Sequence, residues 1–134
     1  MKTIPRGIRN NNPGNIKYTG IAWKGLAKTP SDGVFCIFTD ARYGIRALAK
    51  LLRNYNRYYG IRTLQSIIKR YAPATENQTE AYIKSVAKHT GYDPHTQLDL
   101  ENEVVLVNVI KAIIKHENGQ QPYTDQEIQD GLKC

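Results

Sequence analysis

The sequence predicts an α+β domain in which helices predominate. Short apolar segments separated by turn residues occupy the first 40 residues, and apolar residues recur at helical spacing afterwards. A length of 134 residues and a hydrophobic content of 40% suit one domain with a real core. No apolar run approaches the roughly 20 residues that a bilayer crossing needs. We therefore expect a single globular domain over residues 1–134, with no repeat, linker or membrane span.

The first 40 residues predict a small antiparallel sheet. Residues 6–15, RGIRNNNPGN, are rich in Asn, Gly and Pro and predict an ordered loop, because these residues favour turns. Three short strands follow, over residues 15–20, 21–27 and 33–40, and TPSDG at residues 29–33 supplies a hairpin connection.

The rest of the chain predicts four helices and a short fifth one. Each begins at a capping residue and ends at a Gly or Pro. The expected helices run from Asp40 to Gly60, from Thr63 to Pro73, from Asn77 to Gly91, from Asp99 to Gly119, and onward from Thr124. The fourth is apolar around most of its circumference, which predicts that it crosses the middle of the domain.

The net charge and the cysteines indicate which partners and which cellular compartment to expect. A net charge of +7 favours an anionic partner, such as nucleic acid, a membrane surface or an acidic wall polymer. The first residues have no apolar central region typical of a secretory signal, so we expect synthesis in the cytoplasm without a signal peptide. Cys36, within an apolar strand, and Cys134 are expected to be free thiols.

Glu117 is the first candidate for chemistry. Leu106, Ile110, Ile113 and Glu117 fall at spacings of four, three and four, so the glutamate continues the apolar face of the fourth helix. Partial desolvation and the negative end of the helix dipole both favour the neutral form of such a carboxyl. A protonated carboxyl can act as a general acid, which is what the departing oxygen of a glycosidic bond requires.

Plainer roles remain open at this end of the helix. Glu117 could be a solvated terminal residue whose charge is balanced by Lys115 and His116, and His116 could orient a substrate or have no function. The spacing of His89, His95 and His116 does not fit a metal site, and no glycine loop for phosphate is present. We expect neither a metal nor a cofactor.

Two motifs resemble known proteins. IIKHENGQQPY, residues 113–123, resembles the catalytic helix of lysozyme-like lytic transglycosylases and muramidases. Together with RGIRNNNPGNIKYTG, GVFCIF, YGIRALAKLL and YAPATENQTEAYI, it resembles a family of small phage virion or endolysin-type proteins of the lysozyme-like superfamily. This resemblance spans nearly the whole chain. It implies a lysozyme-like domain that degrades peptidoglycan, with Glu117 as the general acid.

The order of the motifs differs from the usual lysozyme-like order, because the glutamate here follows the Asn-Pro-Gly-Asn loop. A circular permutation would account for this if the chain ends lie close together. The substrate-binding residues would then be Asn12, Asn15, Tyr18 and Tyr123, whose amides and hydroxyls suit N-acetyl groups. The alternative is that the Asn-rich loop satisfies its own backbone.

An ordinary glycosidase needs a second carboxylate, at about 5 Å or about 6.5–9.5 Å from the first. Glu76 is our catalytic candidate, and Glu80, Asp32 and Asp40 are the others, although Glu76 and Glu80 could simply stabilise a helix start. If none of them faces Glu117, a lytic transglycosylase becomes attractive, because there a hydroxyl of the substrate replaces water.

The sequence thus predicts a peptidoglycan-cleaving glycosidase, either a muramidase or a lytic transglycosylase. It would be a monomer or virion-associated, would bind no nucleic acid, and would reach the periplasmic wall by holin-assisted release or as a virion component. A basic stripe on the first long helix, from Arg42 to Arg57, could hold the wall polymer or be a solvated face. The alternatives are a non-enzymatic virion or tail structural protein, a glycan-binding module, and a helical nucleic-acid-binding domain.

Overall fold

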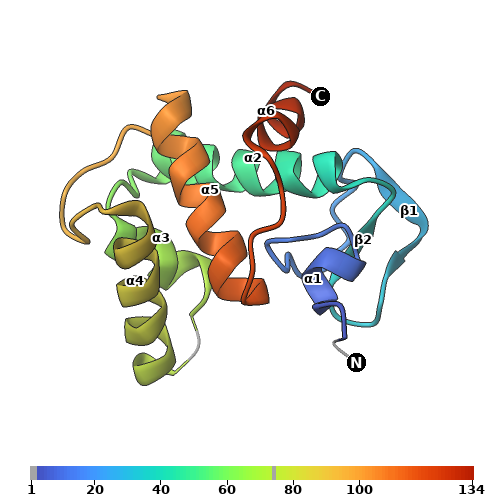
Figure 1. The fold of residues 1–134 in the computed structure, drawn as a ribbon, viewed down its shortest axis with the longest axis horizontal. Coiled ribbons are helices and arrows are strands. Elements are labelled where there is room, and N and C mark those ends of the chain that lie inside the picture. The colour runs from blue at the N-terminus through green and yellow to red at the C-terminus, as the bar shows by residue number, and fades with distance from the viewer. Residues whose placement is uncertain (1–2, 74) are drawn as a thin grey trace.

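The computed structural model describes residues 3–73 and 75–134, apart from the side chains of residues 76 and 77. About 53% of the chain is helical, and the fold is α+β as predicted. Across the described residues, six helices accompany one two-stranded antiparallel sheet (Figure 1). The elements are α1 (Arg6–Arg9), β1 (Leu26–Ser31), β2 (Cys36–Phe38), α2 (Ala41–Tyr59), α3 (Leu64–Tyr71), α4 (Glu76–Thr90), α5 (Glu103–Asn118) and α6 (Asp125–Lys133).

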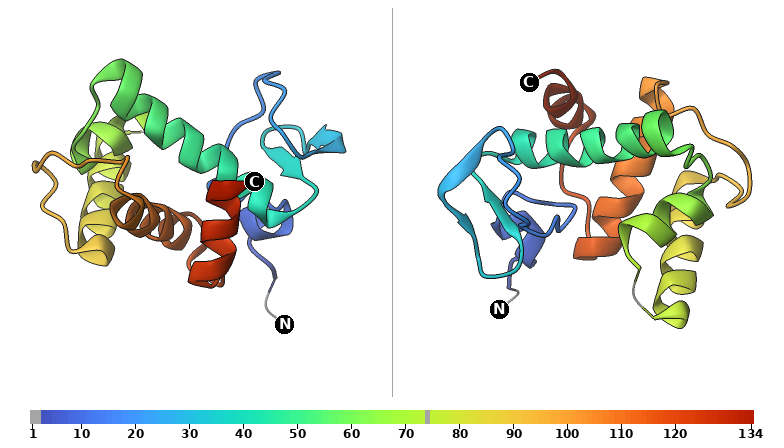
Figure 2. Two further views of the ribbon diagram at one scale, coloured as in Figure 1. Left: turned by 90° about the horizontal axis from the view of Figure 1, so that it is seen from above. Right: turned by 180° about the vertical axis from the view of Figure 1, so that it is seen from behind.

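Helix α2 connects two lobes. The sheet lobe, residues 6–38, contains α1, β1 and β2 and lies at the N-terminal end of α2. The helical lobe, residues 64–90, contains α3 and α4 and lies at the other end (Figures 1 and 2). Helix α5 crosses between them and contacts α1, α2, α4 and α6. The prediction that this apolar helix runs through the middle of the domain is confirmed.

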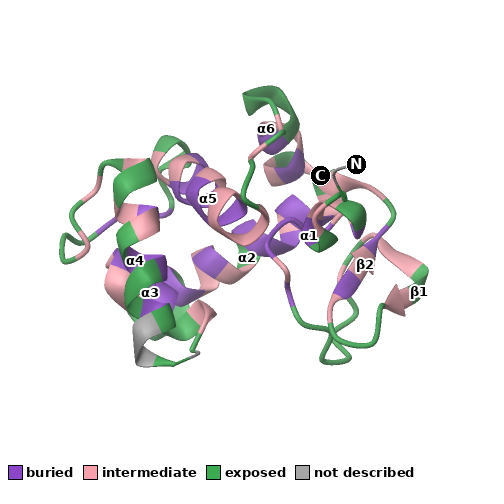
Figure 3. Cartoon of the chain, turned by 60° about the horizontal axis from the view of Figure 1, so that its bottom comes forward, coloured by how far each residue is buried: buried purple, intermediate pink, exposed green. Residues whose placement is uncertain are grey.

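The hydrophobic core lies where α5 packs against its neighbours (Figure 3). Seven residues of α5 are buried, and this explains why its sequence is apolar on most sides. The core continues along the inner face of α2 through Ile45, Leu48 and Leu52, which have no exposed surface. The packing of α5 against α2 therefore fixes the position of the C-terminal end of α5.

The boundaries of α2, α3 and α6 follow the predicted caps. Asp40 accepts a hydrogen bond from the backbone N–H of Arg42, while Thr63 and Thr124 each form a capping box. Gly60 ends α2 in the left-handed conformation, with φ of 64°.

Two predicted caps were wrong. The N-cap of α4 is Thr75, whose hydroxyl accepts from the N–H of Gln78, rather than Asn77. The N-cap of α5 is Asn102, because the predicted cap, Asp99, instead accepts from the N–H of Glu101 in a separate turn before the helix. The C-terminal ends of these helices, at Gly91 and Gly119, are as predicted.

The first 40 residues are less regular than predicted. The expected loop contains the short helix α1, and residues 15–20 form only an isolated bridge between Lys17 and Phe35. The predicted strand over residues 21–27 begins only at Leu26, because Gly25 has a φ of +85° and the Tyr43 ring packs against it. The hairpin between β1 and β2 is confirmed.

The structure does not exclude the predicted circular permutation, because the Asn-rich loop lies against Glu117 rather than far from it. The permutation therefore stays a prediction. The lysozyme-like character of the fold stays a prediction. No helix among the described residues is long and apolar enough to cross a bilayer.

Candidate functional site

The two most distinctive motifs of the sequence meet in space. The side-chain amide of Asn15 donates a hydrogen bond to Oε1 of Glu117, at 2.8 Å. The neighbouring Asn118 donates from its amide to the carbonyl of Pro13, also at 2.8 Å. Residues more than 100 positions apart are therefore joined by two bonds, and the Asn-Pro-Gly-Asn loop lies against the C-terminal end of α5.

The Asn-rich loop is shaped by its own side chains. Asn12 is completely buried, donates to the carbonyls of Ile16 and Cys36, and accepts from the N–H of Ile16. Asn12 therefore has no exposed surface to offer a sugar, because its amide is bonded to carbonyls of the loop and of β2. Asn15 has a φ of 52°, a conformation that asparagine tolerates, and this turns its side chain toward Glu117.

Tyr82 holds the other oxygen of the carboxylate. Its hydroxyl donates to Oε2 of Glu117 at 2.8 Å, and its ring stacks on His116 with the centroids 3.8 Å apart. Burial raises the pKa of Tyr82 well above its usual value, so the hydroxyl stays protonated at neutral pH. Each oxygen of Glu117 thus has one partner, which fixes the plane of the carboxyl group.

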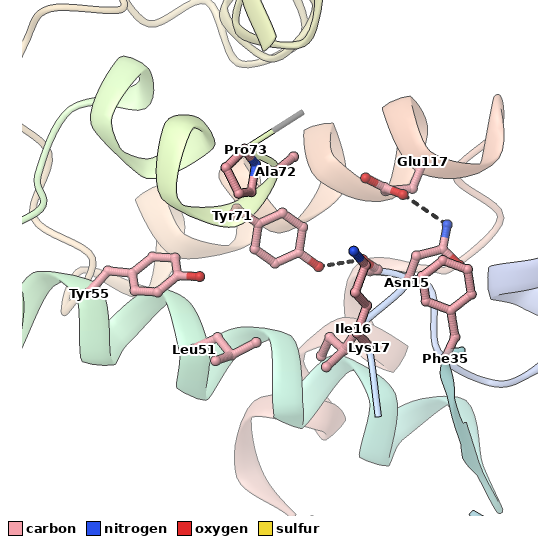
Figure 4. Close-up of a pocket in the computed structure, with 11 residues that line it drawn as sticks. Asn15, Ile16, Lys17, Phe35, Leu51, Tyr55, Tyr71, Ala72, Pro73 and Glu117 are labelled. Carbon is pink, nitrogen blue, oxygen red and sulfur yellow. Dashed lines mark hydrogen bonds between the residues drawn. The ribbon is translucent and has the colours of Figure 1, made fainter. Parts of the chain in front are cut away.

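Glu117 opens into a pocket of about 480 Å³ between the two lobes, which we call the Glu117 pocket (Figure 4). Its wall on the sheet lobe consists of residues 14–17 and Phe35, and its wall on the helical lobe of residues 71–73. The pocket is completed by Leu51 and Tyr55 of α2. The carboxylate is therefore presented to a mostly apolar concavity large enough for a sugar unit.

Tyr71 bridges the two walls of this pocket. Its hydroxyl donates to the carbonyl of Gly14, and burial raises its pKa well above the usual value. A Cβ on Gly14 would lie 2.6 Å from this hydroxyl oxygen and 3.2 Å from Leu48, so only glycine fits there. The glycine of the motif thus permits the contact that connects the lobes.

Of the other predicted site residues, Tyr18 and Tyr123 do not line the Glu117 pocket. Tyr18 is 38% exposed beside the β-bridge, whereas Tyr123 is half-buried against the core. Their predicted contact with substrate in this pocket is not supported. Glu76 is the first residue of α4, and its side chain lies outside the described residues.

Among the described residues that line the pocket, Glu117 is the one carboxylate. Asp32 accepts from Arg6 and Asn10, and the bond from the Arg6 guanidinium is the main cause that holds the pKa of Asp32 well below its usual range. Asp40 caps α2, and Glu80 is exposed on α4. No group of three or more His, Cys, Asp or Glu residues in the described chain is arranged to hold a metal ion.

Sequence reasoning missed Tyr71, Tyr82 and Asn118. Both tyrosines occupy core-facing positions of predicted helices, where an aromatic residue is usually explained by packing alone. Asn118 directly follows the candidate acid, and that adjacency was the available signal. Each of the three forms a hydrogen bond with a residue far away in the sequence, and these partners are Gly14, Glu117 and Pro13 respectively.

No family model matches the chain. It is 43% identical over 131 residues to a protein named Protein P5 of Pseudoalteromonas phage PM2. The match covers 96% of this chain and 80% of the phage protein, so it includes both walls of the pocket and the glutamate helix. This chain therefore belongs to the family of the phage PM2 protein P5.

Proposed function

We propose that this protein cleaves the glycan strands of bacterial peptidoglycan, with Glu117 as the general acid. The supporting observation is the placement of this carboxyl, which lines a pocket while Asn15 and Tyr82 hold its two oxygens. A fixed proton donor at the edge of a concavity is what glycosidic cleavage requires.

The two hydrogen-bond partners of Glu117 differ in whether they allow the oxygen that they contact to carry a proton. The Asn15 amide nitrogen can only donate, so Oε1 acts as an acceptor. The Tyr82 hydroxyl can donate or accept, so Oε2 is the oxygen that can carry a proton and still keep its partner. In the reaction this proton moves to the glycosidic oxygen, the bond from that oxygen to the anomeric carbon breaks, and the bonding electrons leave with the oxygen.

The lytic transglycosylase form of this reaction needs a single carboxyl group, and Glu117 is the one carboxylate among the described residues that line the pocket. There the muramyl hydroxyl of the substrate forms the new bond to the anomeric carbon. The Glu117 carboxylate, having given up its proton, takes the proton of that hydroxyl and is regenerated. One carboxyl group thus serves as acid and then as base, and no water is consumed.

The positive charge of the chain and its similarity to a phage protein support the same substrate. Lys17 lines the pocket and the chain carries a net charge of +7, which suits a polymer bearing stem-peptide carboxylates. A relative from a bacteriophage fits a role in opening the wall, as a lysin released through a holin or as a virion component.

Mass spectrometry of fragments released from purified peptidoglycan tests this proposal. We expect fragments from the parent protein and none from Glu117→Gln, with Glu80→Gln, an exposed glutamate outside the pocket, as the active control. Masses lower by one water than those of hydrolysis products would identify anhydro sugars. Binding without fragments from the parent protein would support a glycan-binding module instead, and equal activity of Glu117→Gln would exclude this acid.

A further inference from the structure

Glu117 also faces a second concavity, on the side of α4. This hollow has a volume of about 420 Å³ and is lined by Ala72, Gln78, Ala81, Tyr82, His116 and Glu117. We call it the His116 hollow. Ala72 and Glu117 line both it and the Glu117 pocket. The carboxyl group therefore lies at the boundary between two adjoining concavities, rather than at the closed end of one.

The wall of the His116 hollow is fixed relative to the carboxyl. The His116 ring stacks on Tyr82 with an interplanar angle of 28°, and the Tyr82 hydroxyl is bonded to Glu117. Tyr82 itself is only 5% exposed, so the ring that supports His116 is held by the core. A ligand against His116 would thus be positioned with respect to the proton donor.

The polar groups of this hollow suit an uncharged ligand rich in hydroxyl groups. Burial lowers the pKa of His116, which keeps the ring neutral near pH 7 with one N–H donor and one acceptor nitrogen. The Gln78 amide, on an exposed residue of α4, adds both a donor and an acceptor.

We infer that the His116 hollow binds a sugar of the same glycan strand, on the opposite side of the scissile bond from the sugar in the Glu117 pocket. The strand then passes over Glu117, and contacts on both sides position the bond. This inference rests on the proposed function. It adds that binding energy comes from both sides of the cut, so filling this hollow weakens binding to the strand although the Glu117 pocket is intact.

Co-sedimentation with insoluble purified peptidoglycan measures this binding without cleavage. The background is Glu117→Gln, because the Gln side chain can accept from Asn15 and donate to the Tyr82 hydroxyl. Ala81→Trp fills the hollow from an exposed position, and Ala22→Trp is the control at an exposed alanine outside both concavities. We expect the dissociation constant to rise about tenfold with Ala81→Trp, a change of about 1.4 kcal/mol, and to stay constant with Ala22→Trp.

His116→Ala, compared with His95→Ala in an exposed loop, provides a second pair that adds no bulk. Circular dichroism of every variant checks that the fold is retained. Equal binding by Ala81→Trp and Ala22→Trp, with His116→Ala also unchanged, would overturn the inference while fragment release by the parent protein still upheld the glycosidase. Failure of the parent protein to release fragments would overturn the proposed function, and the inference with it.

Discussion

Asn15 combines a left-handed backbone with a side chain that reaches Glu117. Glycine at this position would tolerate the same backbone conformation and remove the side chain that carries the amide. Asn11 offers a matched control, because its φ is 53° and its side chain donates to the carbonyl of Phe38 instead. A comparison of Asn15→Gly with Asn11→Gly therefore separates the effect of losing an asparagine side chain from the effect of losing the hydrogen bond to Glu117.

We expect Asn15→Gly to lower the initial rate of fragment release by on the order of tenfold to a hundredfold, because the carboxyl loses its fixed orientation. Asn11→Gly should lose stability with little change in rate. Rates measured per folded molecule, with the folded fraction taken from circular dichroism, check this. Similar rate losses in both variants would mean that Asn15 only supports the loop.

Tyr82→Phe removes one hydroxyl and keeps the ring that stacks on His116. We expect a loss of at least about tenfold in rate, since hydrogen bonds to charged groups contribute about 1.5–3 kcal/mol. Tyr92→Phe is the control, because that hydroxyl accepts from Asn108 outside the site. The pH dependence of the rate should change in Tyr82→Phe alone, and unaltered profiles in both variants would argue against a role for the hydroxyl in positioning the proton.

His116 makes stability depend on pH. Burial lowers its pKa in the folded state, so below the unfolded value of about 6.5 the unfolded chain binds a proton that the folded chain does not. Stability should therefore fall as the pH falls from about 7 toward the folded pKa. Asp32, whose folded pKa is also lowered, loses its contribution only below about pH 4.

Urea unfolding at pH 7.5 and 5.5 tests the histidine. We expect His116→Gln to show a smaller loss of unfolding free energy between the two pH values than the parent protein. His95→Gln, in an exposed loop, should behave like the parent. A loss of the same size in His116→Gln would assign the pH dependence to other groups.

At the scale of elements, the position of the Asn-rich loop depends on its contact with α2. Gly44 lies in the first part of this helix, and a Cβ there would come within 2.0 Å of the carbonyl oxygen of Asn11. The loop thus lies directly on the helix backbone. Any side chain at position 44 would have to displace the loop segment that carries Asn15.

Gly44→Ala tests this contact against helix propensity. Alanine is intrinsically better than glycine in a helix by about 1 kcal/mol, yet we expect a net destabilisation of about 1–3 kcal/mol because the clash is with backbone. The melting temperature should fall by several degrees and the rate of fragment release should fall with it. Lys50→Ala, on the exposed side of α2, is the control. An unchanged or raised melting temperature would show that the loop can move without cost.

Elements with strong local signals were predictable from the sequence. The boundaries of α2 are fixed by a capping Asp40 and a left-handed Gly60, and both are local effects. The cap of α5 was misplaced because Asp99 and Asn102 both suit a cap, and the choice depends on the turn between them. The sequence predicted longer strands in the sheet lobe than the structure has. The turn at Gly25 depends on packing against Tyr43, a residue of α2, which no local pattern shows.

At the scale of the whole molecule, the candidate site depends on the relative positions of the sheet lobe and the helical lobe. Glu117 was identifiable from the sequence because it continues an apolar helical face. Its partners were harder to predict, since Asn15 belongs to the sheet lobe and Tyr82 to the helical lobe. The Tyr71 hydroxyl bonded to the Gly14 carbonyl joins the same two lobes. Such contacts arise from tertiary packing, which no local pattern encodes.

The basic stripe on α2 is partly neutralised in the folded chain. Arg42 is paired with Asp40 and Arg57 with Glu101, whereas Arg46 donates to the carbonyl of Cys134 and keeps its charge. A wall polymer would therefore meet less free charge along this helix than the sequence suggests. Among the described residues that line the Glu117 pocket, Lys17 is the basic one that would meet the proposed substrate.

The bond between Asn15 and Glu117 spans 102 positions, and this has a consequence for synthesis. A nascent chain emerges from the ribosome with the sheet lobe first, and contacts between distant residues form late in folding. The segments that line the pocket walls thus leave the ribosome before Glu117 does, although their packing requires α5, which lies at the centre of the core. A chain interrupted before α5 would lack both the central core helix and Glu117, so the proposed wall-cutting activity would arise only once translation has passed α5.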